Sequence, residues 1–311
     1  MSRASSSAAS AASAASSSAS ASASVSPSSS PSASATSGLA RRVPGLLVSL
    51  ALVLVALVFF YPMIWMVLSS FKTNGAIFQT PFALPESIDF GRWAEAWEVG
   101  NIGAYAVNSA ITTAVSVLAI LLLGSGAAFA FSRYRFRGRG ALMGVFALGL
   151  ILPLQSYFIA QSTLFTQLGI TDTRLALIIP YTGMGLSLAI YLLKVYLDAL
   201  PEELFEAARM DGASDVRLFT ALALPLLRPG IATVAIFSAL NTWNEFLLAL
   251  LYIQDDALKT IPTGLLAFST RYVTDYSLLF AALSIVTVPM VVVYVVFNRQ
   301  IVEGITAGSV K

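Results

Sequence analysis

Long apolar runs dominate the pattern of hydrophobic and polar positions along this chain. A helix that crosses a bilayer needs about 20 predominantly apolar residues. Runs of about that length lie near residues 45–70, 105–131, 141–160, 174–196, 229–253 and 275–298. The third run is the least regular, because Pro153, Gln155 and Ser156 interrupt it. The pattern predicts an all-α polytopic membrane protein with about six transmembrane helices.

The first 42 residues do not share this pattern. They are almost entirely Ser and Ala with a few Pro, and such a segment has too little apolar surface to offset the entropy lost on ordering. We therefore predict a disordered tail at residues 1–42 and a membrane domain at residues 43–311. No apolar region precedes Arg41 and Arg42, so we interpret this pair as a positive anchor for the first span rather than as an export signal.

Composition excludes several functional classes. The chain is 57% hydrophobic and 11% charged, with a mean hydropathy of +0.79, which is too apolar for a soluble protein. It contains neither Cys nor His, so disulfides, thiol–metal sites and imidazole catalysis are excluded. We predict no catalytic residues and no metal site, and we expect that the chain is not an enzyme. A net charge of +2 gives no indication of nucleic-acid binding.

The distribution of basic residues predicts the orientation in the membrane. Cytoplasmic segments are enriched in Lys and Arg, and one set of alternate segments is much richer than the other. The richer set contains Arg41, Arg42, Arg133, Arg135, Arg137, Arg139, Lys194, Arg209, Arg217, Arg228, Arg299 and Lys311, against Lys72, Arg92, Arg174, Lys259 and Arg271. Both termini are therefore expected in the cytoplasm. Trp93 and Trp97 lie in an outward loop, where interfacial anchoring is favoured over contact with an external partner.

One polar stretch between two spans, residues 198–230, stands out and is called the polar hairpin here. Pro201, with acidic residues after it, suits the start of a short helix, and Gly212 supplies a positive-φ stop. Ser214 can cap a second helix, which the Leu224–Pro225 pair interrupts. The spacing of that helix places an apolar ridge at Val216, Phe219, Thr220 and Ala223 on one face.

The polar hairpin reads EAARMDGASDVRLFTALALPLLRPG from Glu206, and it resembles the cytoplasmic EAA loop of the membrane subunits of binding-protein-dependent ABC importers. Several further stretches, WNEFLLAL, FSRYRFRGR and the closing GITAGSVK, resemble the carbohydrate-uptake branch of that family, and most of all the smaller permease of the maltose/maltodextrin type. The resemblance covers about residues 45–311. The residues that match the loop are Glu206, Ala207, Ala208, Asp211, Gly212, Ala213, Phe219, Leu224, Pro225 and Pro229.

This resemblance implies a type I importer permease fold in the cell (plasma or inner) membrane. It implies a second permease, two ATPase subunits, an extracytoplasmic solute-binding protein, a sugar substrate and surrounding membrane lipid as partners. The EAA loop would couple this chain to the ATPase. No Lys follows a Gly, so the chain lacks a GxxxxGK[ST] phosphate loop. We expect that it binds no cofactor and that the partner ATPase uses ATP and Mg. The alternative for the hairpin is an ordinary cytosolic connection.

A stripe of polar residues along the run 229–253 is the candidate transport path. Ser238, Asn241, Asn244 and Glu245 follow at i, i+3, i+6 and i+7. A carboxylate at that depth is costly, so it should face the bundle or water. Amides and a carboxylate suit sugar hydroxyls, but they also suit helix–helix hydrogen bonds, and the sister permease could supply most sugar contacts. The alternative function is an ion-gradient-driven secondary transporter that uses Glu245, which leaves the hairpin unexplained.

Overall fold

The computed structural model describes residues 37–153, 156–269 and 274–307. These residues form helices and loops, with one isolated bridge between Ser269 and Thr274. The chain divides into two units, Met1–Leu57 and Val58–Lys311. Most of the predicted tail (residues 1–36), together with Gln155, Arg271 and Lys311, lies outside the described residues.

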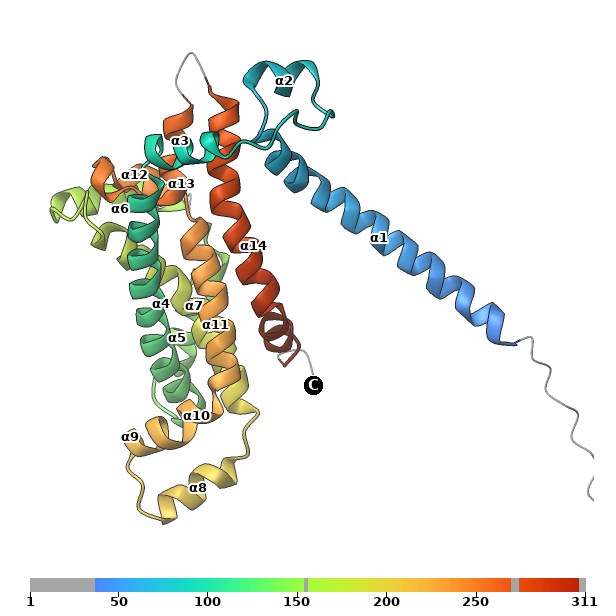
Figure 1. Cartoon of the computed structure of the whole chain (residues 1–311). Coiled ribbons are helices and arrows are strands. Elements are labelled where there is room, and N and C mark those ends of the chain that lie inside the picture. The colour runs from blue at the N-terminus through green and yellow to red at the C-terminus, as the bar shows by residue number, and fades with distance from the viewer. Residues whose placement is uncertain (1–36, 154–155, 270–273, 308–311) are drawn as a thin grey trace, which may run out of the picture. The chain divides into compact units, whose positions relative to one another are not determined.

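The long helices correspond to the apolar runs (Figure 1). They are α1 (Ser37–Ser69), α4 (Ile102–Arg133), α5 (Arg139–Ile151), α7 (Leu175–Asp198), α11 (Arg228–Asn244) and α14 (Tyr276–Ala307). Short helices lie between them: α2 (Asn74–Gln79), α3 (Gly91–Val99), α6 (Phe158–Gln167), α8 (Glu202–Met210), α9 (Asp215–Arg217), α10 (Leu224–Leu226), α12 (Leu247–Tyr252) and α13 (Ile261–Gly264).

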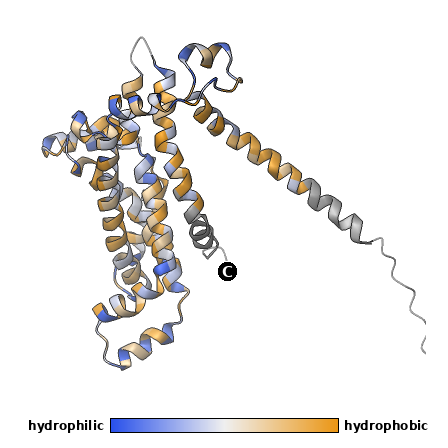
Figure 2. Cartoon of the chain, viewed as in Figure 1, coloured by the Kyte–Doolittle hydropathy of each residue, from blue (hydrophilic) through white to orange (hydrophobic). Residues whose placement is uncertain are grey.

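Three stretches among the described residues are long and apolar enough to cross a membrane: Val48–Ser69, Ile102–Arg133 and Leu175–Asp198. A fourth arises if Asp215–Leu226 and Arg228–Asn244, bent by 74°, form one span. Figure 2 shows apolar residues along the long helices and hydrophilic ones in the loops and the hairpin. The all-α, multi-span prediction is confirmed.

Two of the predicted spans are interrupted. The run 141–160 is divided into α5 and α6, because α5 ends at Ile151 just before Pro153. The run 229–253 is divided into α11 and α12 at Glu245 and Phe246. Neither residue of this second break is Pro or Gly, the residues that usually mark a helix end, so the sequence did not predict the break.

The packing of α4 against α7 forms the main core of the second unit. Ile120, Ala128 and Phe129 of α4 are buried in one cluster with Ala189, Leu193 and Leu197 of α7. The helices approach closely at Gly124, where a Cβ atom would lie 2.8 Å from the Cβ of Ala189. Small residues allow such close helix contacts within a membrane.

The predicted outward loop is fixed by hydrogen bonds from the side chains of Lys72 and Trp93. The Lys72 ammonium donates to the carbonyl oxygens of Thr80 and Pro81 at 3.2 and 3.1 Å. Trp93 of α3 donates from Nε1 to Ser70 Oγ at 3.0 Å and stacks on Phe71. Trp93 is therefore part of the packing of the protein itself.

Candidate functional site

The polar hairpin begins with α8, whose ends are built as the sequence predicts. Glu202 and Glu203 lie in its first turn, where they complement the helix dipole. At its other end, Gly212 has φ +79°. The N–H of Gly212 donates to Arg209 O and the N–H of Ala213 donates to Ala208 O, each at 3.0 Å. This pair of bonds is a Schellman motif, so the predicted glycine stop is confirmed.

The second arm of the hairpin follows directly and contains a π-helical turn. Ser214 accepts a hydrogen bond from Arg217 N at 3.4 Å, which confirms the predicted cap. Residues Leu218–Ala223 then adopt π-helical geometry, and Leu224 N–H donates to Phe219 O, five residues back. The arm ends at Leu226 and meets α11 at a bend of 74°.

The π turn changes which residues of this arm share a face. The ridge predicted from a 3.6-residue period is divided, because Val216 and Thr220 are exposed whereas Ala223 is buried. Ala223 instead shares the core with Leu218 and Leu227. The ridge prediction was therefore wrong, since one wide turn shifts the helical phase.

The inner face of the hairpin is anchored by aromatic packing. Phe205 of α8 is fully buried. Its ring centroid lies 6.4 Å from that of Phe129 in α4, and Phe219 lies 5.4 Å from the same ring. Both arms of the hairpin thus pack on one residue of the main core.

Arg133, at the end of α4, joins the hairpin to α7. Its guanidinium lies 3.9 Å from the centre of the Phe205 ring. It also donates hydrogen bonds to the carbonyl oxygens of Leu197, in the last turn of α7, and of Leu200, just after the helix. The guanidinium is an arginine's and stays charged at neutral pH. The sequence reading treated Arg133 only as a topology determinant and missed this role.

The outer face of the hairpin is left uncovered in this chain. Among its apolar side chains, Leu204, Met210 and Val216 are exposed by 44%, 88% and 72%. The residues matched to the EAA loop divide accordingly: Ala208, Ala213, Phe219 and Leu224 are half-buried, while Glu206, Ala207, Asp211, Gly212, Pro225 and Pro229 are exposed. A large apolar side chain that stays exposed among polar neighbours indicates a contact surface.

The candidate transport residues lie beside a cavity of about 360 Å³, called the polar cavity here. Its walls come from α4, α5, α7 and α11. Ser238, Asn241 and Glu245 line it, but Asn244 does not. The cavity therefore contains three of the four residues of the predicted stripe. Sequence reasoning missed the other polar lining residues, Tyr157, Tyr181 and Thr242.

Glu245 has hydrogen-bond partners within the chain. Tyr181 donates from its hydroxyl to Glu245 Oε2 at 2.7 Å. The backbone N–H groups of Leu248 and Ala249 donate to the same carboxylate at 2.9 to 3.3 Å. Glu245 therefore satisfies the first turn of α12 in the broken span. This bonding is why a carboxylate is tolerated among apolar helices.

The two asparagines make the same local bond and differ in what they face. Asn241 donates from Nδ2 to Phe237 O at 2.9 Å, and Asn244 donates to Leu240 O at 2.8 Å. Each amide thereby uses one donor on its own helix. Only Asn241 presents its remaining groups to the polar cavity.

Comparison with known proteins supports a single family. Residues 120–306, more than half of the chain, match the family model described as binding-protein-dependent transport system inner membrane component. The diacetylchitobiose uptake system permease protein NgcG of Streptomyces coelicolor is 36% identical over 265 residues, covering 84% of this chain and 87% of that protein. The probable starch degradation products transport system permease protein AmyC of Thermoanaerobacterium thermosulfurigenes is 31% identical, covering 86% and 96%.

A solved structure supports the fold. One chain in the crystal structure of a bacterial ABC transporter involved in the import of the acidic polysaccharide alginate superposes with a TM-score of 0.73 at 23% identity. The match covers 87% of this chain and 99% of that one.

Proposed function

The chain belongs to the family of binding-protein-dependent transport system inner membrane components, and on that basis we propose that it is a permease subunit of an ATP-driven importer of an uncharged sugar or oligosaccharide. It would pair with a second permease, two ATPase subunits and an extracytoplasmic solute-binding protein. Its work would be alternating access, without bond chemistry of its own.

The polar hairpin is the observation that carries the proposal. Its inner face is fixed to α4 and α7 through Phe205 and Arg133. Its outer face presents Leu204, Met210 and Val216, a surface suited to an ATPase. Because the second arm continues into α11 after one bend, displacement of the hairpin would move a wall of the polar cavity. ATP and Mg would be bound by the ATPase, since this chain has no phosphate loop.

The chemistry of the polar cavity supports the substrate class. Hydroxyl, phenol and amide groups line it together with one carboxylate, and Lys and Arg are absent from its lining among the described residues. Sugar hydroxyls can donate to and accept from such groups, whereas an anionic sugar would meet Glu245 without a compensating cation. The names of relatives, which include diacetylchitobiose and starch degradation products, support a saccharide.

Purification of the tagged chain from its native membrane in mild detergent tests the proposal. We expect a second permease and an ATPase in stoichiometric amounts by mass spectrometry, and ATP-dependent uptake after reconstitution with the binding protein. If the chain is isolated alone and transports solute along an ion gradient without ATP, the secondary transporter is the correct function instead.

A further inference from the structure

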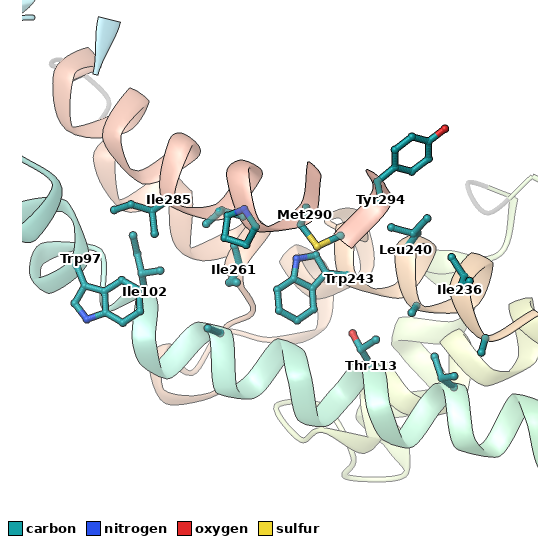
Figure 3. Close-up of a pocket in the computed structure, with 16 residues that line it drawn as sticks. Trp97, Ile102, Thr113, Ile236, Leu240, Trp243, Ile261, Ile285, Met290 and Tyr294 are labelled. Carbon is teal, nitrogen blue, oxygen red and sulfur yellow. The ribbon is translucent and has the colours of Figure 1, made fainter. Parts of the chain in front are cut away.

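A second and larger cavity lies on the opposite side of α11 from the polar cavity. It has a volume of about 680 Å³ and is called the apolar cavity here. Figure 3 shows its walls, which come mainly from α4, α11 and α14, with Trp97 at one end and Tyr294 toward the other. Most of its lining is hydrocarbon or thioether, and four side chains carry a polar group: Trp97, Thr113, Trp243 and Tyr294. Trp97 and Tyr294, at the ends of the cavity, are exposed by 48% and 49%.

The two buried polar groups of the lining are the Thr113 hydroxyl and the Trp243 indole N–H. Thr113 is only 9% exposed, and neither Thr113 Oγ1 nor Trp243 Nε1 has a hydrogen-bond partner although both atoms are buried. Figure 3 shows the Thr113 hydroxyl turned from α4 into the cavity and the Trp243 ring lying across it from α11. A helical threonine normally bonds a carbonyl of its own helix, so its orientation into the cavity needs a reason.

We propose that the apolar cavity binds a neutral, membrane-dissolved lipid through a carbonyl or hydroxyl oxygen that accepts hydrogen bonds from Thr113 and Trp243. Ligand sites of about 300–1,000 Å³ with apolar walls and a few placed polar groups are the usual form of small-molecule pockets. An acceptor oxygen is the one group that satisfies the Trp243 N–H, which only donates.

The polar groups and the depth of the cavity favour a neutral lipid. The apolar side chains of a neighbouring helix would offer no acceptor oxygen to Thr113 and Trp243. Thr113 lies eleven residues into α4, about 16 Å along the helix axis. A charged phospholipid headgroup at that depth would be costly, which leaves uncharged lipids such as acylglycerols or isoprenoid quinones.

Occupancy has a consequence that rests on the proposed function. Ala239 and Trp243 of α11 face the apolar cavity, while Ser238 and Asn241 of the same helix face the polar cavity. A bound lipid would therefore restrain the helix that must move during alternating access and would slow uptake. Lipid binding is measured without transport, so a failure of the lipid-binding proposal can be distinguished from a failure of the proposed importer function.

Two photoreactive C16 probes, identical except that one carries a ketone oxygen, test the site in the intact complex in nanodiscs. We expect the ketone to label peptides around Thr113 and Trp243 about fivefold more than the hydrocarbon, the factor that corresponds to one net hydrogen bond of about 1 kcal/mol. Thr113→Val with Trp243→Phe should abolish this preference. Ala239→Phe, which places a ring inside the cavity, should lower labelling by both probes, whereas Ala114→Phe on the exposed face of α4 should not.

Extraction of lipids from the purified complex identifies the natural occupant. Enrichment of an acylglycerol or of a quinone over the Ala239→Phe variant would support the proposal and name the source. Equal labelling by both probes, labelling that Ala239→Phe leaves unchanged, or a peptide of another subunit crosslinked at Trp243 would each overturn it.

Discussion

Gly212 occupies a backbone conformation that most residues avoid, and the space around it is open. Its φ is +79°, and no atom lies within 4 Å of the position of a Cβ. A β-branched residue would therefore be penalised by backbone strain alone, by about 1–2 kcal/mol. We expect Gly212→Val to lower uptake while ATP hydrolysis and membrane levels persist, because the Schellman turn is disturbed.

Asparagine provides the matched control at this position, since it tolerates the left-handed region. Gly212→Asn should keep most of the uptake measured with radiolabelled sugar in proteoliposomes. Normal uptake by Gly212→Val at a normal membrane level would show that coupling does not depend on this turn.

Asn241 and Asn244 form a natural pair for testing the polar cavity. Each donates to a carbonyl four residues back, so replacement by Ala removes the same local bond. Only Asn241 lines the polar cavity. Asn241→Ala should raise the KM for uptake several-fold, and Asn244→Ala should not change it. Equal effects of the two variants would assign both residues to helix packing.

Glu245 gives a second prediction at the same cavity. We expect Glu245→Gln to change uptake more than the amount of assembled complex, because the amide oxygen can still accept one bond from the first turn of α12 while the charge is lost. Uptake and membrane-extracted complex should be measured side by side. Loss of the complex itself would mean that the carboxylate serves only to hold α12.

At the level of elements, the attachment of the hairpin depends on one guanidinium. Arg133 stacks on Phe205 and donates to two carbonyl oxygens at the end of α7, and lysine cannot supply both geometries at once. We expect Arg133→Lys to increase amide hydrogen exchange severalfold across the hairpin and not in α4 or α7. Arg137→Lys, at an exposed position in the loop that follows α4, is the control. Unchanged exchange in Arg133→Lys would place the attachment in the aromatic packing alone.

The contact between α4 and α7 can be tested with two glycines of α4, of which only Gly124 lies against the neighbouring helix. A Cβ at Gly124 would lie 2.8 Å from the Ala189 Cβ, whereas at Gly126 it would meet nothing within 4 Å. Overpacking a close contact costs about 1–3 kcal/mol. Gly124→Val should therefore lower the melting temperature of the detergent-extracted complex, and Gly126→Val should leave it nearly unchanged. Similar melting of the two variants would mean that the helices can separate at Gly124 without cost.

Across the whole molecule, the sequence predicted helix caps and stops, but it did not predict contacts between residues far apart in the chain. The cap at Ser214 and the stop at Gly212 depend on backbone chemistry within a few residues, so both were predicted correctly. The break at Glu245 carries no Gly or Pro signal. Pro225 follows the π turn at Leu218–Ala223, but its position predicts the end of the helix, whereas the arm continues to Leu226. The Arg133–Phe205 contact and the Tyr181–Glu245 hydrogen bond join residues 72 and 64 positions apart. Hydrophobic periodicity describes windows of fewer than 20 residues, so it does not predict such contacts.

The 74° bend at Leu227 determines how force would pass along the chain. The arm Asp215–Leu226 has twelve residues, a length of about 18 Å, and it stands nearly crosswise to α11. A lateral displacement of its tip would therefore rotate α11 about the helix axis. Because α11 ends at the break at Glu245, the rotation would act directly on the helix that lines both the polar and the apolar cavity.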